Sequence, residues 1–252
     1  MGIIAISFLS IFVAKINLDF VPGQLVSLVG PNGAGKTTLL KLISGVLEPA
    51  SGQIHIYDQL SENLSHKERA LLISLVPQNP KLPLEMGFTD FIMLGRNPHL
   101  KLLQWESAAD FKIAKESINL TEIDHLIQRK LGEVSGGERQ RIMLALAMTQ
   151  RSPIMLLDEP TSNLDISHQT KVMSLIKKIH DQKSNDGATI LAIHDLNIAA
   201  QFSDRVILFS EGIVAVDGTP EEVLTKNNIE AIYGSEVSII PHPEHGSPLI
   251  IS

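Results

Sequence analysis

A phosphate-loop pattern near the N-terminus constrains the fold more than any other feature of this 252-residue chain. Residues 24–29 form a short, largely apolar run that predicts a buried strand. The pattern Gly-x4-Gly-Lys-Thr follows from Gly30, and a helical pattern begins at Thr38. Strand, glycine-rich loop and helix, in this order, are the context that a phosphate loop requires. By chance the pattern would occur in roughly one chain of this length in a hundred, so we interpret it as a nucleotide site.

The residue types in the loop match the chemistry of phosphate binding. Gly33 and Gly35 let the backbone turn tightly, so that N–H groups point inward at an anion, and the start of the next helix adds partial positive charge. Lys36 is predicted to reach the β- and γ-phosphates, and the hydroxyl of Thr37 to bind Mg²⁺. The predicted nucleotide contacts are Gly30, Pro31, Asn32, Gly33, Ala34, Gly35, Lys36, Thr37 and Thr38.

Two adjacent carboxylates follow a second apolar run. Residues 154–157 come after a proline and are too few for an independent helix, which favours a fully buried parallel strand. Asp158 and Glu159 stand at its C-terminal end, where α/β sheets bind ligands. We predict that Asp158 binds Mg²⁺ beside Thr37, and that Glu159 orients or deprotonates the attacking water. Without the phosphate loop, a solvated loop end would be the better interpretation.

A Ser-Gly-Gly-Glu segment lies between these two motifs, at residues 135–138. Ser135 is predicted to cap a helix that runs to residue 149, and the free N–H groups and dipole of such a helix attract an anion. Alone, the segment would be an ordinary helix start. Beside the other motifs we interpret it as a second phosphate cradle, formed by Ser135, Gly136, Gly137 and Glu138.

Two single residues follow other predicted strands. Gln78 comes after the short apolar segment 74–77, and His194 after the buried run 189–193. The remaining eight of the nine histidines are interpreted as ordinary surface or core residues. His242 and His245 share one short loop, which we interpret as solvated surface; a metal site is the alternative.

The motifs, in this order and spacing, resemble the ATP-binding subunits of ABC transporters over nearly the whole chain. The resemblance implies a P-loop NTPase α/β fold with a mostly parallel sheet, antiparallel N-terminal strands and an inserted helical subdomain. It implies one domain over residues 1–252, with 1–78 and 153–252 as the nucleotide-binding core lobe and 79–152 as the helical signature lobe. It also implies ATP hydrolysis, with ATP and Mg²⁺ as cofactors.

The resemblance assigns roles to the candidate residues. In that family the nucleotide lies between two subunits paired head to tail, so Ser135, Gly136 and Gly137 of one copy would cap the γ-phosphate held by Lys36 of the other. Glu159, His194 and Gln78 would be catalytic. Thr37, Gln78 and Asp158 would bind the metal, and Asp165 would face the partner subunit. The family usually stacks adenine on an aromatic residue near the N-terminus, where the candidates here are Phe8 and Phe12.

Composition excludes several other classes. The net charge of −7 and the sparse aromatic residues disfavour a dedicated nucleic-acid binder. The absence of cysteine excludes disulfides and thiolate metal sites. No apolar stretch is long enough to span a bilayer. Residues 1–14 are apolar but lack the basic start of a signal peptide, and we interpret them as edge-strand material.

Four segments further resemble the ATPases of importers for iron–siderophore, haem and cobalamin. This resemblance implies an integral membrane permease as partner, an indirect substrate-binding protein, and a peripheral location at the cytoplasmic face of the membrane. An exporter ATPase and a soluble ABC protein of iron–sulfur cluster assembly stay open as alternatives, whereas a phosphate-loop kinase or GTPase would lack the Ser-Gly-Gly segment. The four segments are residues 94–100, 194–200, 218–224 and 242–248.

Overall fold

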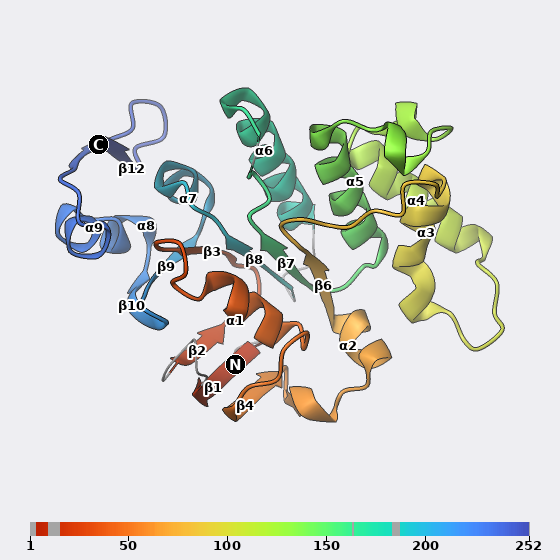
Figure 1. Cartoon of the computed structure of the whole chain (residues 1–252), viewed down its shortest axis with the longest axis horizontal. Coiled ribbons are helices and arrows are strands. Elements are labelled where there is room, and N and C mark those ends of the chain that lie inside the picture. The colour runs from red at the N-terminus through yellow and green to blue at the C-terminus, as the bar shows by residue number, and fades with distance from the viewer. Residues whose placement is uncertain (1–3, 10–15, 163, 183–186, 252) are drawn as a thin grey trace.

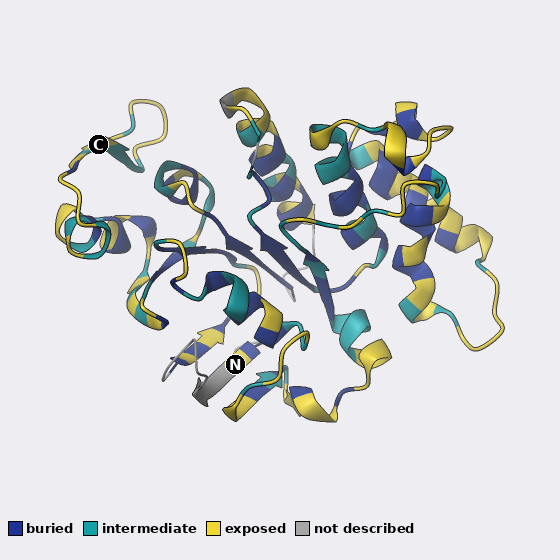
Figure 2. Cartoon of the chain, in the orientation of Figure 1, coloured by how far each residue is buried: buried dark blue, intermediate teal, exposed yellow. Residues whose placement is uncertain are grey.

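A mostly parallel six-stranded sheet forms the centre of the molecule. The computed structural model describes residues 4–9, 16–162, 164–182 and 187–251. The strand order is β10-β9-β3-β8-β7-β6, and only the β10–β9 pair is antiparallel. Every residue of β3, β7 and β8 is buried, as the dark strands of Figure 2 show, because both faces of the sheet are covered, one by helices and the other by α1 together with the N-terminal sheet. The strands are β3 (Leu25–Val29), β6 (Ile73–Val76), β7 (Ile154–Asp158), β8 (Ala188–Ala192), β9 (Arg205–Ser210) and β10 (Ile213–Gly218).

The predicted antiparallel N-terminal strands form a second sheet of order β2-β1-β4-β5. The interpretation of residues 1–14 as an edge strand was wrong, because β1 pairs with β2 on one side and β4 on the other. The strand β4 begins beyond residue 50 and pairs with the side of β1 that β2 leaves free. Phe8 lies in β1, and Phe12 lies outside the described residues. The strands are β1 (Ile4–Leu9), β2 (Ile16–Phe20), β4 (Ser51–Ile56) and β5 (Gln59–Leu60).

Apolar residues fill the space on both faces of the central sheet. Alternate side chains of β3 point to opposite faces: Val26 and Leu28 join the core between the two sheets, whereas Leu25 and Val29 join the larger core on the other face. The helix α1 lies on the first face and α6 and α7 on the second (Figure 1). Their bounds, with that of the neighbouring α2, are α1 (Lys36–Ile43), α2 (His66–Leu72), α6 (Ile166–Gln182) and α7 (Leu196–Phe202).

The elements described between β6 and β7 are all helical, and they stand together on the right of Figure 1. The helix α5 has the predicted bounds. The division of the chain into a core lobe and a signature lobe over residues 79–152 stays a prediction. The elements are α3 (Phe88–Met93), η2 (Leu94–His99), α4 (Ala108–Leu120), η3 (Asp124–Leu126), η4 (Leu131–Glu133) and α5 (Gly136–Thr149).

The C-terminal part adds two short helices and a hairpin. The helix α8 begins as its sequence indicates, with Thr219 accepting from the backbone N–H of Glu222 and with Pro220 in the first turn. The rings of His242 and His245 stack 3.8 Å apart. Among the described residues, no three His, Cys, Asp or Glu side chains gather as metal ligands. None of the described helices is long and apolar enough to cross a bilayer. The remaining elements are η1 (Ser61–Asn63), α8 (Pro220–Val223), α9 (Lys226–Tyr233), β11 (Ser238–Pro241) and β12 (Pro248–Ile251).

Candidate active site

The phosphate loop joins β3 to α1 and has a backbone that glycine makes possible. Gly33 and Gly35 have φ angles of +81° and +105°, in the left-handed region that favours glycine. Gly30 has φ of +143°, and a Cβ atom there would lie 2.2 Å from the carbonyl oxygen of Phe209. The backbone thus bends sharply where β3 ends, and α1 begins at Lys36, directly after the loop.

Lys36 folds back over this loop. Its side chain is nearly buried, and its Nζ donates to the carbonyl oxygens of Gly30 (2.7 Å) and Pro31 (3.0 Å). Burial lowers the pKa of Lys36, and the nearby carboxylates of Glu159 and Asp158 oppose that change. An anion bound within the loop would therefore stabilise the charged form of Lys36.

A cavity of about 260 Å³ opens in front of the loop. Besides the loop, Glu159 and His194 line it, although they lie far along the sequence. Ser135, Gly136 and Gly137 do not contribute to it. The lining residues are Asn32, Gly33, Ala34, Gly35, Lys36, Thr37, Thr38, Glu159 and His194.

Asp158 and Thr37 meet at the inner end of the site. The hydroxyl of Thr37 donates to Oδ1 of Asp158 at 2.7 Å. Burial raises the pKa of Asp158, although the Thr37 hydrogen bond counteracts this, so a neighbouring cation would stabilise the charged carboxylate. One carboxylate and one hydroxyl, completed by phosphate oxygens and water, suit Mg²⁺. These residues therefore fit the predicted metal.

Glu159 has the most unusual backbone in the site. Its φ of +50° lies in the left-handed region, and its N–H donates to Ala192 at the end of β8 (2.8 Å). In this conformation its carboxylate accepts a hydrogen bond from the side-chain amide of Gln78 and pairs with Nε2 of His194. Such strain in a non-glycine residue is typical of functional sites. The structure thus brings the three predicted catalytic residues together around one carboxylate.

The Ser-Gly-Gly segment begins α5 as predicted. The N–H of Ser135 donates to Oε2 of Glu138 at 2.7 Å, and the N–H of Glu138 donates to Oγ of Ser135 at 3.3 Å. The hydrogen bonds that the carboxylate of Glu138 accepts from the backbone N–H and the side chain of Ser135 hold its pKa down at about 2. Ser135 and Gly136 are exposed, and a Cβ atom at Gly136 would meet nothing within 4 Å. Within one copy, this helix start faces open space.

Asp165 lies at the start of α6 and makes only local bonds among those described. Its carboxylate accepts from the N–H of His168 at 2.9 Å and from the hydroxyl of Ser167 at 2.9 Å. The contact of Asp165 with a partner subunit stays a prediction. The ring of His168 lies near the start of α5, since a Cβ atom at Gly137 would lie 3.8 Å from it.

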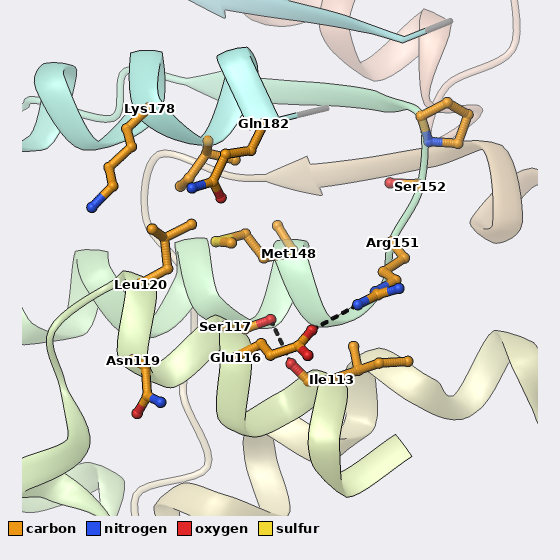
Figure 3. A pocket seen from close by; sticks show the side chains of 13 residues that line it. Ile113, Glu116, Ser117, Asn119, Leu120, Met148, Arg151, Ser152, Lys178 and Gln182 are labelled. Carbon is orange, nitrogen blue, oxygen red and sulfur yellow. Dashed lines mark hydrogen bonds and ion pairs between the residues drawn. The ribbon is translucent and has the colours of Figure 1, made fainter. Parts of the chain in front are cut away.

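None of the phosphate-loop residues lines a second, larger cavity of about 900 Å³. It opens between α4, the end of α5 and α6, and the ion pair of Glu116 and Arg151 (2.8 Å) lies on its wall (Figure 3). Pro153, which precedes β7, also lines it, so the cavity lies at the starts of the parallel strands. It contains none of the predicted site residues and is not part of this chemistry.

Comparison with known proteins agrees with this geometry. The profile of the ABC transporter family matches residues 13–162. The hemin import ATP-binding protein HmuV of Gloeobacter violaceus is 36% identical over 94% of this chain and 87% of its own length. The ferric enterobactin transport ATP-binding protein FepC of Escherichia coli is 34% identical over 94% of this chain and 87% of its own.

Solved structures share the fold. A protein described as a metal-chelate type ABC transporter, in an inward-facing conformation, superposes with a TM-score of 0.84 at 24% identity and covers 100% of this chain and 97% of its own. The ATP-binding cassette MJ0796, in a dimeric post-hydrolysis state with ADP and Pi, gives 0.75 at 26% identity, over 86% of this chain and 98% of its own. The chain belongs to the ABC transporter family, as one of its ATP-binding, ATP-hydrolysing subunits.

Proposed function

We propose that this chain is the ATPase of an importer that takes up a metal chelate of the haem or iron–siderophore class. HmuV and FepC, named for hemin import and ferric enterobactin transport, match it over nearly its full length. In this proposal the ATPase does not bind the cargo. The class of cargo is therefore inferred from the named relatives and not from the geometry of the site. Cobalamin import belongs to the same proposal.

The carboxylate of Glu159 carries the catalytic part of the proposal. It lines the phosphate-loop cavity while Gln78 and His194 both hold it. A carboxylate fixed in this way would orient the attacking water and accept its proton. His194, which lines the same cavity, would donate a hydrogen bond to the γ-phosphate. Gln78 would contact Mg²⁺ or the attacking water. Lys36 and the loop N–H groups would bind the remaining phosphate oxygens.

Mg²⁺ is the proposed metal cofactor. Thr37 and Asp158 would hold it, with Gln78 as a further oxygen ligand. Once bound, it would neutralise charge on the phosphates and stabilise the ionised carboxylate of Asp158, whose pKa is raised by burial.

A second copy would complete the site. In one copy the start of α5 is exposed and does not line the phosphate-loop cavity, which leaves the outer side of that cavity open. In a head-to-tail pair, Ser135 and Gly137 of each copy would bind the γ-phosphate held by the other, and Asp165 would lie at the contact. The dimeric state of MJ0796 supports this arrangement.

A membrane permease would be the second partner. Residues 1–78 and 153–252 would act as a nucleotide-binding core and residues 79–152 as a helical lobe. Closure of the pair would move the surface around Gln78 and residues 79–105, where the permease would bind. The ATPase would then sit on the cytoplasmic face of the membrane, and a substrate-binding protein would meet only the permease.

The variant Glu159→Gln tests the two-copy site. It keeps the shape of the side chain but removes the base, so we expect ATP binding with turnover reduced about 100-fold or more. Trapped ATP should shift the isolated chain to a dimer in size-exclusion chromatography with ATP, and not with ADP. Elution of this variant as a monomer at every ATP concentration would contradict the shared site.

Co-purification tests the class of partner. An importer subunit should co-purify with a permease that spans the membrane several times, and proteoliposomes of that complex should take up haem or a ferric siderophore only with ATP. Recovery of soluble iron–sulfur assembly proteins instead would favour the alternative.

A further inference from the structure

A turn between η2 and α4 exposes three large apolar side chains. Leu102, Leu103 and Trp105 are 92%, 93% and 86% exposed, whereas Val46, the next most exposed large apolar residue described, is 61% exposed. The turn projects from the helical part of the molecule (Figure 1), and its surface is exposed throughout (Figure 2). Clustered exposed apolar side chains mark an interaction surface.

Hydrogen bonds hold the shape of this turn. The N–H of Gln104 donates to the carbonyl oxygen of Lys101 (3.0 Å), and the N–H of Lys101 donates to Oε1 of Gln104 (2.9 Å). At its base, Nζ of Lys67 donates to the carbonyl oxygen of Leu100 at 2.5 Å. Leu103 has φ of +63°, a conformation that leucine rarely adopts. The turn therefore presents its leucines outward at a cost in backbone energy.

Two lysines lie at the turn, although the net charge of the chain is −7. Lys101 belongs to the turn, Lys67 donates to the carbonyl oxygen of Leu100 at its base, and Glu106 follows the turn. This surface thus combines two leucines, a tryptophan and two lysines.

We propose that residues 101–105 insert into the headgroup region of an anionic lipid bilayer. Leucine and tryptophan beside lysine are the composition of interfacial membrane anchors. The projecting shape of the turn suits a deformable lipid surface, because a protein partner would need a matching pocket. The turn lies at the end of the surface assigned above to the permease, but this contact with lipid would form without the permease and without ATP.

Trp105 provides a direct test, because it is the only tryptophan in the chain. We expect its fluorescence to shift to shorter wavelength when the purified chain meets phosphatidylcholine vesicles that contain phosphatidylglycerol. Lipids brominated on the acyl chain should quench it. Pure phosphatidylcholine vesicles should give a smaller shift, and salt should weaken the binding.

Two substitutions separate lipid binding from folding. Leu102→Ser and Leu103→Asn should each lower the partition into anionic vesicles roughly tenfold, and asparagine tolerates the backbone conformation of Leu103. Val46→Ser, at an exposed apolar position elsewhere, should leave vesicle binding unchanged. All three should retain the wild-type ATPase rate in solution.

Three results would overturn the proposal. One is an unchanged Trp105 spectrum with anionic vesicles. Another is a shift that needs the permease in the vesicles, which would assign the turn to that protein. The last is a shift that grows with protein concentration without lipid, which would assign it to self-association.

Discussion

At the scale of single residues, the site depends on backbone conformations as much as on side-chain chemistry. Glycines permit the turns of the phosphate loop, while Glu159 adopts a left-handed conformation without being glycine. Its N–H bond to Ala192 and its side-chain contacts with Gln78 and His194 hold that conformation. The identity of these residues was readable from sequence, whereas the strain at Glu159 was not.

Lys36→Ala should abolish most nucleotide binding and turnover. The variant removes the buried cation that bonds to Gly30 and Pro31 and that lines the cavity. Titration with a fluorescent ATP analogue and phosphate-release assays would measure both effects. Lys112→Ala, at an exposed position on α4, serves as the control and should behave as wild type. An unchanged ATPase rate in Lys36→Ala would remove this residue from its assigned role.

Gly30→Ala should destabilise the fold by at least about 2 kcal/mol, because the new methyl group would overlap the backbone of Phe209. Gly136→Ala is the matched control: its methyl group would meet open space, and alanine favours the helix. Urea unfolding of both variants would compare their free energies of unfolding. Equal stability of the two would show that the loop relaxes around Gly30.

At the scale of elements, the segment 94–100, which contains η2, contacts the end of α5. A Cβ atom at Gly95 would lie 2.7 Å from the carbonyl oxygen of Leu146. Arg96 donates to the carbonyl oxygen of Thr149 (2.9 Å), and Nε2 of His99 hydrogen-bonds that of Gln150 (2.7 Å). One of the four segments that resemble importer ATPases therefore holds the C-terminal end of α5.

Arg96→Met should lower the free energy of unfolding by about 3–5 kcal/mol. The reason is that Asp110, paired with Arg96 at 2.8 Å and almost buried, would lose its partner cation. Arg151→Met breaks the pair with Glu116, of which both members are more than half exposed, and should cost no more than about 1 kcal/mol. Thermal and urea unfolding would compare the two variants. Similar losses would contradict the buried-pair argument.

At the scale of the whole molecule, sheet order assembles the site. The phosphate loop, His194, Glu159 and Gln78 follow β3, β8, β7 and β6, which are adjacent in this order and parallel. Because the carboxyl ends of parallel strands share one edge, residues up to 164 positions apart in the sequence (Gly30 to His194) meet there.

His180 connects three parts of this assembly and should make stability depend on pH. Its Nε2 donates to the carbonyl oxygen of Gly23 (3.2 Å), so its Nδ1 accepts from the hydroxyl of Thr189 (3.1 Å). Burial lowers the pKa of His180 below its usual 6.5. As the pH falls, His180 is therefore protonated in the unfolded chain before it is protonated in the folded chain. The neutral side chain makes its full contribution to stability above pH 6.5, and this contribution is lost as the pH falls toward the lowered pKa.

Urea unfolding between about pH 7.5 and 5 would measure this effect. The variant His180→Gln should show a weaker dependence on pH over that range, while His66→Gln, at an exposed position, should match the wild type. An equally steep dependence in His180→Gln would assign the effect to other groups.

Local patterns in the sequence determined the phosphate loop, the buried strands 154–157 and 189–193, and the capped helix from Ser135, because each depends on residues close together in the chain. Only the tertiary structure decided that β1 lies inside its sheet, that segment 94–100 supports α5, and that Glu159 bonds to both Gln78 and His194. The physical reason is that strand neighbours, helix contacts and strained backbones arise from packing between distant segments, which no local pattern of polarity records.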